Sequence, residues 1–403
     1  MSERFLEKNV AITGIGQSAF GRPSKSSTLE LTVDACLQAI ADAGLQRSDI
    51  DGIASFPGEL PDTSGLAPVG ITSTMLALNL KVNWHSAINR ESPSQLGSVF
   101  AAAAAIAAGF ADHVLVFRTI GEASAWEHGK EGWATRHAHS EGAGAPRVGG
   151  TWQWMMPFNA YSATPWFAMY ARYHFDRYGT RPEQLAQIAL NARRNAQGNP
   201  NAVYRKPMTL DDYMGSRMIA DPLRLYDCDV PIDGCTAFVL SRKDMARHMR
   251  NPPIRLEAIG SALRHRDTWM RPESFEAPAS SDAAAMMWNR TLLKPSDVDV
   301  AQLYDGFSIH TLYWLESLGF CKRGEAGAFI EGGHRIAREG ELPLNTGGGQ
   351  LSGGRWHGLG HLHEACTQLW GRGGERQVTR DPKVAVVANG AAAFVGCMLV
   401  VRD

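Results

Sequence analysis

The sequence predicts an α/β protein built from two similar halves, because one stretch of the chain is written twice. Residues 45–53 read LQRSDIDGI, and residues 293–301 read LKPSDVDVA. An apolar strand precedes each copy, VAITGIG at 10–16 and IRLEAIG at 254–260. Each copy also has a helical segment between strand and turn, at 31–43 and 283–292. A repeat of this length is too long for a solenoid unit and indicates a duplicated α/β domain with a crevice between its halves.

The first half, residues 1–250, alternates strands with helices. Strands are expected at 9–14, 52–56 and 113–118, with helices at 29–43 and, rich in alanine, at 92–109. Such alternation is typical of a mostly parallel sheet covered by helices on both faces.

The alternation stops between about 121 and 222. This stretch contains helical patterns at 166–178 and 182–196 and five tryptophans: Trp126, Trp133, Trp152, Trp154 and Trp166. We interpret it as an insertion in the first half that lies over the crevice, where the Trp and Met side chains form an apolar cover.

The second half, residues 251–403, ends with a Gly-rich loop and three regular elements. The loop covers 347–354, a helix is expected at 359–371, and strands are expected at 383–387 and 394–401. No low-complexity linker separates the two halves, so we expect one rigid unit.

Composition excludes several classes of function. Lys and Arg number 40 against 41 Asp and Glu, for a net charge of −1, and the basic residues form no long run. This balance argues against nucleic acid or a membrane surface as partner. No apolar run approaches about 18 residues and no leader is recognisable, so a cytoplasmic protein is expected. The six cysteines lack CxxC spacing and are expected to be reduced thiols.

Several segments together resemble the thiolase superfamily, in particular the branch related to sterol-carrier-protein and lipid-transfer thiolases. They are VAITGIGQSAFGR at 10–22, AAAAAIAAGFADHVLVF at 101–117, the run from Tyr178 to Gly234, and NTGGGQLSGGRWHGLG at 345–360. The resemblance covers nearly the whole chain. It implies the thiolase fold, with α/β/α/β/α layers, and a homodimer.

The residues that a degradative thiolase uses are replaced. The nucleophilic cysteine at the start of the Ala-rich helix corresponds to Ser92, counting back from Phe110. The histidine of the His-Asp-Cys-Phe motif corresponds to Tyr304, and the histidine of the Gly-His-Pro motif to Arg355. A serine without an activating histidine is a poor nucleophile, so thiolysis is not expected.

The Tyr304-Asp305-Gly306-Phe307 motif looks like that of the thiolase-like aldolases of steroid side-chain degradation. That resemblance implies retro-aldol cleavage of a β-hydroxyacyl-CoA to a ketone and a short acyl-CoA, with no cofactor beyond the CoA thioester itself. It also implies a small zinc-ribbon and OB-fold partner protein of the domain-of-unknown-function-35 family. The second tyrosine that those aldolases use in the Gly-rich loop is missing here, where Trp356 and Leu359 stand.

Tyr304 and His357 are the candidate catalytic residues. A retro-aldol reaction needs a base for the β-hydroxyl proton and a donor that stabilises the enolate and protonates its carbon. Tyr304 follows a buried strand, and Arg355 is a candidate cation for lowering its pKa. A structural tyrosine that hydrogen-bonds a turn is the alternative. His357 either donates to the enolate oxygen or caps the helix that begins near Leu359.

Substrate-binding positions are assigned to six residues: Ser92, Asp305, Asn345, Arg355, Trp356 and Asn389. No metal site is expected from His357, His361 and His363, because Gly358 and Gly360 oppose the helix that would align them.

Two other functions stay open at this point: a catalytically silent acyl-CoA-binding subunit, and an acyltransferase that uses Ser92. In the expected homodimer, the strand near 113–118 contributes an exposed edge.

Overall fold

The computed structural model describes residues 5–55, 65–87, 94–128, 152–160, 162–264 and 273–403. Nine strands form one sheet in the order β3-β2-β4-β7-β1-β8-β11-β10-β9. Their bounds are β1 (Val10–Gln17), β2 (Gly52–Ser55), β3 (Trp84–Ala87), β4 (His113–Gly121), β7 (Asp233–Arg242), β8 (Ile254–Leu263), β9 (Val300–Leu303), β10 (Val384–Ala391) and β11 (Phe394–Arg402).

The predicted duplication is confirmed. β1, α1 (Thr28–Ala43) and β2 in the first half correspond to β8, α12 (Ala279–Trp288) and β9 in the second. Each repeated Ser-Asp turn folds the same way: the Asp49 carboxylate accepts the Gln46 N–H at 2.7 Å, and the Asp297 carboxylate accepts the Lys294 N–H at 2.8 Å. The sheet is continuous because β1 of one half pairs with β8 of the other.

Glycine at the end of each repeated strand motif permits close packing of helix on strand. A Cβ on Gly16 would lie 2.1 Å from the Ala35 carbonyl oxygen of α1, and a Cβ on Gly260 would lie 1.9 Å from that of Ala283 in α12. The Gly-x-Gly pattern in β1 therefore serves helix packing.

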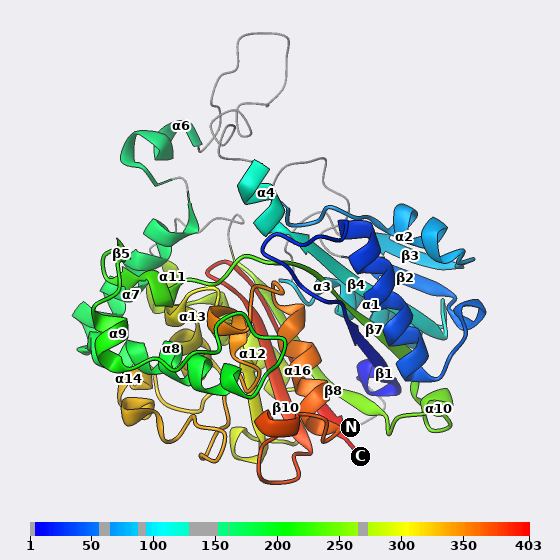
Figure 1. Cartoon of the computed structure of the whole chain (residues 1–403). Coiled ribbons are helices and arrows are strands. Elements are labelled where there is room, and N and C mark those ends of the chain that lie inside the picture. Colours follow the sequence, from blue (N-terminus) through cyan, green and yellow to red (C-terminus); the bar gives the residue numbers. More distant parts are fainter. Residues whose placement is uncertain (1–4, 56–64, 88–93, 129–151, 161, 265–272) are drawn as a thin grey trace.

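The helices form three layers around the two parts of the sheet, as the thiolase fold requires (Figure 1). Outside the first half, α1 and α2 (Ile71–Leu78) cover β2, β4 and β7. Between the halves, α3 (Gly97–Ala107) and α16 (Leu359–Leu369) share one buried apolar cluster with strands of both halves. Outside the second half, α12 and α13 (Ser308–Ser317) cover β8 to β11.

Helices α7 (Ala163–Tyr178) and α8 (Pro182–Gln197) pack on the second half, although the chain reaches them from the first. Phe167 and Tyr170 of α7 and Leu185 of α8 belong to the apolar cluster that α13 contributes to. Trp126 and Trp154 are 69% and 70% exposed, so these two side chains do not form a buried cover, while Trp133 lies outside the described residues.

The remaining described elements are short. They are α4 (Glu122–His128), α6 (Trp152–Met155), α9 (Leu210–Met214), β5 (Met218–Ala220), β6 (Leu223–Arg224), α10 (Lys243–Ala246), α11 (Glu273–Glu276), α14 (Ala326–Phe329), α15 (Gly349–Ser352) and the 3-10 turns at 6–9, 47–49, 156–158, 225–227, 295–297, 331–333 and 374–376. None of the described helices is long and apolar enough to cross a membrane.

Three expectations about the first half are wrong. The sheet is mixed, because β7 pairs antiparallel with both β1 and β4, and β11 pairs antiparallel with both β8 and β10. The Ala-rich helix begins at Gly97, not at 92, because residue 94 takes a left-handed backbone that cannot continue a helix. The strand at 113–118 is no edge, because β4 lies between β2 and β7; β3 is the edge strand on that side.

The close helix–strand approach makes Gly260→Ala strongly destabilising. The added methyl would overlap the Ala283 carbonyl, and relieving that overlap should cost about 1–3 kcal/mol of unfolding free energy, measured by urea denaturation. Gly109→Ala is the control: its Cβ meets nothing within 4 Å, and only its φ of 78° opposes the change, at about 1 kcal/mol. Equal losses in both variants would contradict the packing argument.

Candidate active site

The site forms where β9 and β10 end, side by side and parallel. Beyond β9 the chain turns through Tyr304, Asp305 and Gly306 into α13. The Tyr304 N–H donates to the Ala388 carbonyl of β10 at 2.8 Å, which fixes the start of this turn against Asn389. Polar side chains at the ends of parallel strands meet at one edge of the sheet, the usual place for a binding site in an α/β fold.

Tyr304 is 7% exposed, and its ring lies between two histidines. It stacks on His310 with ring centroids 5.5 Å apart, and its centroid lies 6.3 Å from that of His361. A Cβ on Gly306 would lie 2.7 Å from the Tyr304 hydroxyl, so only glycine leaves room for this ring. Burial lowers the pKa of His310 to about 3, so the stacked imidazole is neutral.

The Asn345 side chain hydrogen-bonds to the backbone at the end of β9. Its side-chain oxygen accepts the Leu303 N–H at 2.8 Å, and its side-chain nitrogen donates to the Leu303 carbonyl at 2.9 Å. Both polar atoms of the amide are thus bonded to the backbone just before Tyr304. This geometry gives Asn345 a role in placing Tyr304; its expected contact with substrate stays a prediction.

His357 is a neutral imidazole between two arginines. Its Nδ1 contacts a guanidinium nitrogen of Arg118, and its Nε2 lies 3.4 Å from one of Arg355. Burial, with the charges of Arg118 and then Arg355, holds the pKa of His357 well below its usual value. Guanidinium groups only donate, so the closer contact assigns the lone pair to Nδ1 and the proton to Nε2. The ring is therefore a donor in a positive field.

Arg355 is tied to two carboxylates. It lies 2.8 Å from Glu122 and 2.9 Å from Asp229. Burial raises the pKa of Asp229 to about 7; Arg355 opposes this shift, and the carboxylates of Glu122 and Asp305 add to it. These two carboxylates already compensate the positive charge of Arg355. The lowering of the Tyr304 pKa expected from Arg355 therefore stays a prediction.

Asn389 and Trp356 hold the loop that carries His357. The Asn389 side chain donates to the Gly358 carbonyl at 3.1 Å. Trp356 is 7% exposed and packs edge-to-face on Phe20, with ring centroids 6.2 Å apart. A Cβ on Gly234 would lie 2.5 Å from the Trp356 ring, so the indole fills the space that this glycine leaves.

Ser92 lies outside the described residues, and the first described residue after it is Ser94. Ser94 is fully buried, has a φ of 73°, and its Cβ lies 3.0 Å from where a Cβ on Gly390 would be. The assignment of Ser92 by counting back from Phe110 stays a prediction. The segment Ser94-Gln95-Leu96 leads directly into α3, which begins three residues after Ser94, at Gly97.

Asp305 and His361 form a buried pair that the sequence analysis did not single out. Asp305 has no exposed surface; its Oδ1 accepts the Gln350 N–H at 2.9 Å and lies 3.1 Å from His361 Nε2. His357 and His361 therefore turn to different partners, and among the described residues no three His, Cys, Asp or Glu side chains come together as a metal site.

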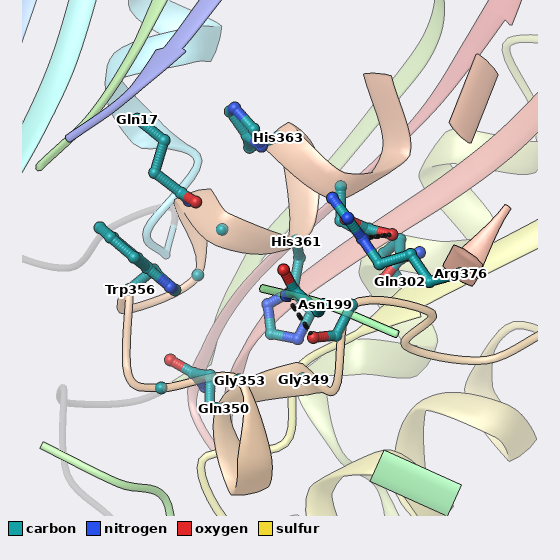
Figure 2. A pocket seen from close by; sticks show the side chains of 15 residues that line it. Gln17, Asn199, Gln302, Gly349, Gln350, Gly353, Trp356, His361, His363 and Arg376 are labelled. Atoms are coloured by element: carbon teal, nitrogen blue, oxygen red, sulfur yellow. Dashed lines mark hydrogen bonds and ion pairs between the residues drawn. The ribbon is translucent and has the colours of Figure 1, made fainter. Parts of the chain in front are cut away.

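A small cavity adjoins the pair. Its volume is about 40 Å³, and its lining includes Gln17, Gln302, Gln350, Trp356, His361 and Arg376. Figure 2 shows the His361 ring among these residues, with Trp356 and Arg376 on opposite sides of it.

Comparison with known proteins agrees with the fold. The family described as thiolase C-terminal domain-like matches residues 260–401. A steroid side-chain-cleaving aldolase of Thermomonospora curvata is 36% identical over 366 residues, 90% of each chain. A 17-hydroxy-3-oxo-4-pregnene-20-carboxyl-CoA lyase of Mycobacterium tuberculosis is 33% identical over 91% of this chain and 92% of its own. An acetyl-CoA acetyltransferase of Methanothermobacter thermautotrophicus is 30% identical over 92% and 93%.

Among solved structures, the one titled Ltp2-ChsH2(DUF35) aldolase superposes with a TM-score of 0.86 at 31% identity, covering 99% of both chains. An acetyl-CoA acetyltransferase from Syntrophomonas wolfei, at 17% identity and a TM-score of 0.70, shares the fold.

The raised pKa of Asp229 predicts a pH-dependent stability. The folded protein holds this proton more tightly than the unfolded chain, whose Asp pKa is about 3.9, so the contribution is complete below about pH 4 and is lost as the pH rises through about 7. Asp229→Asn cannot titrate there. Between about pH 5 and pH 8 the melting temperature of the wild type should fall relative to that of the variant. If the melting temperatures of the two proteins changed with pH in parallel, the pKa of Asp229 would not be raised by folding.

Proposed function

This chain belongs to the thiolase superfamily, in the branch of the sterol-carrier thiolases, and we propose that it is an aldolase that cleaves a β-hydroxyacyl-CoA into a ketone and a shorter acyl-CoA. Two relatives that are 36% and 33% identical to it are named for steroid side-chain cleavage and for a carboxyl-CoA lyase. A bulky steroid or similar alicyclic acyl group is the proposed substrate class.

One observation favours lyase chemistry over thiolysis: the chain offers no thiolate. Burial raises the pKa of all six cysteine thiols, Cys36, Cys228, Cys235, Cys321, Cys366 and Cys397. The thiolate is the reactive form of cysteine, so none of them is poised to form an acyl-enzyme at neutral pH. Carbon–carbon cleavage by retro-aldol reaction needs only proton transfer and stabilisation of an enolate.

In the proposed reaction the β-hydroxyl loses its proton and becomes the ketone carbonyl as the bond between the α- and β-carbons breaks. The electron pair of that bond passes to the α-carbon and the thioester oxygen as an enolate. His357, a neutral donor beside Arg118 and Arg355, is suited to stabilise that oxygen by a hydrogen bond. The two guanidinium groups make the electric field around it positive, so His357 does not first have to take up a proton. Tyr304 is proposed to handle one of the two protons.

Three further assignments accompany this proposal. A partner of the domain-of-unknown-function-35 family is proposed because the similar solved structure carries that name in its title. A homodimer is proposed with β3, the edge strand of the first half, in place of β4 at the interface. Cytoplasmic residence stays a prediction from the sequence.

Acyl transfer is the second candidate function, favoured by Ser94 on its left-handed turn before α3 and by the similar acetyltransferase. Ser94→Ala separates the two functions. Its Oγ accepts a hydrogen bond from the Leu96 backbone N–H at 3.4 Å, and a backbone N–H cannot take the proton of the hydroxyl. We expect less than about a 10-fold loss of cleavage in Ser94→Ala. A loss beyond about 100-fold, with an acyl group found on the wild-type serine by mass spectrometry, would favour acyl transfer.

Tyr304→Phe tests the proposed role of Tyr304. Removing one oxygen should leave folding and CoA binding nearly intact while turnover falls by about 10²–10⁴-fold, the usual contribution of one positioned acid or base. The loss should appear in kcat more than in KM, because the interaction is made mainly in the transition state. Normal turnover would leave Tyr304 as a structural strand-end residue.

The control is Tyr313→Phe. Tyr313 is also buried, on α13, and its hydroxyl donates to the Phe275 carbonyl at 3.3 Å, away from β10. This variant should turn over normally. A matching loss in both variants would point to a general effect of losing a buried hydroxyl.

A further inference from the structure

His361 carries a ring nitrogen that the contacts described so far leave unused. The side chain lies on α16 and is 3% exposed, and its Nε2 lies at hydrogen-bond distance, 3.1 Å, from Oδ1 of Asp305. A buried carboxylate accepts hydrogen bonds, so Nε2 carries the proton and Nδ1 carries the lone pair. Among the described residues, Nδ1 has no hydrogen-bond partner although it is buried.

The surroundings of Nδ1 are built to receive a small hydroxyl group. The cavity that His361 lines measures about 40 Å³, and a water molecule needs about 10–15 Å³ by the same measure. Gln350 lines the same cavity, and within the described part of the chain neither polar atom of its amide has a partner. Buried polar groups are nearly always hydrogen-bonded, so these atoms call for a ligand that donates and accepts.

Asp305 fixes the orientation of the imidazole. Its Oδ1 accepts the Gln350 N–H at 2.9 Å and lies 3.1 Å from His361 Nε2, so two segments hold this oxygen against the ring. A buried carboxylate behind one ring nitrogen sets the tautomer and stabilises the imidazolium that forms when the other nitrogen takes a proton. The pair is thus arranged as a general base.

We propose that Nδ1 of His361, oriented by Asp305, accepts the proton of the substrate's β-hydroxyl, and that a water holds this position before substrate binds. This inference rests on the proposed function. It divides the two proton transfers between His361, at the hydroxyl, and Tyr304, at the α-carbon. The two rings have centroids 6.3 Å apart, on neighbouring parts of one site.

The step balances. The hydroxyl O–H bond breaks and its proton joins Nδ1, while the oxygen electrons form the ketone. The pair from the broken carbon–carbon bond becomes the enolate, and Tyr304 gives its proton to the α-carbon. The imidazolium then gives its proton to solvent water and the Tyr304 phenolate takes one from solvent water, so both groups are restored.

His361→Gln tests the inference, because a glutamine amide can still donate to Asp305 but offers no basic nitrogen. Two reactions are measured: cleavage of the β-hydroxyacyl-CoA, and exchange of the α-protons of the short acyl-CoA product in D₂O. Exchange forms the enolate without any hydroxyl group, so it requires Tyr304 and not His361. We expect cleavage to fall by about 10²–10⁴-fold with exchange within about 3-fold of wild type, whereas Tyr304→Phe loses both.

His174→Gln is the matched control. His174 is fully buried, and its Nε2 lies 2.9 Å from a Glu316 carboxylate oxygen, but this pair sits on α7 and α13 outside the site. This variant should keep both activities, which separates the loss of a base from the loss of a buried His–carboxylate pair.

Each other outcome overturns a defined claim. Normal cleavage by His361→Gln, or equal losses of cleavage and exchange in that variant, would make His361 a structural residue. A wild-type protein that exchanges α-protons but does not cleave would overturn the proposed function and leave the exchange chemistry of Tyr304 standing. A wild type without either activity would overturn both proposals.

Discussion

The burial of the Asp305 carboxylate is the constraint on which the site depends. A buried charge is costly unless it is hydrogen-bonded, and here Oδ1 is bonded from two other segments, the Gly-rich loop through the Gln350 N–H and α16 through His361, while Oδ2 has no hydrogen-bond partner among the described residues. The same carboxylate requires glycine at 349, where a Cβ would overlap Oδ2, and it contributes to the raised pKa of Asp229. Because Asp305 follows Tyr304 directly, these contacts also place the tyrosine.

Around that anchor, the electrostatics favour an enolate over a covalent intermediate. His357 stays neutral between two guanidinium groups, so it can donate without first taking up a proton. Burial in the apolar layers of the fold raises the pKa of buried thiols such as those of Cys36 and Cys397. The thiolase scaffold thus keeps a site suited to a thioester enolate, while the groups for acyl transfer through sulfur are missing.

Sequence alone predicted the repeat, both helices that pack on its strands, and the position of Tyr304 at a strand end, because these follow from apolar periodicity and a repeated turn. It missed what depends on backbone conformation and on contacts distant along the chain. No local pattern marks the left-handed backbone of Ser94, with its φ of 73°, and His361 meets Asp305 across 56 residues. The antiparallel pairing of β1 with β7 and β8 also depends on contacts distant along the chain. The alternation of strands and helices in the sequence does not encode this pairing.

The most direct test of this account is the product balance of the wild-type protein, with its proposed partner, on a β-hydroxyacyl-CoA in D₂O. Retro-aldol cleavage predicts one ketone for each short acyl-CoA, at least one deuterium on the α-carbon of that acyl-CoA, and no consumption of free CoA. A product that forms only when free CoA is consumed, or an acyl group left on the protein, would contradict it.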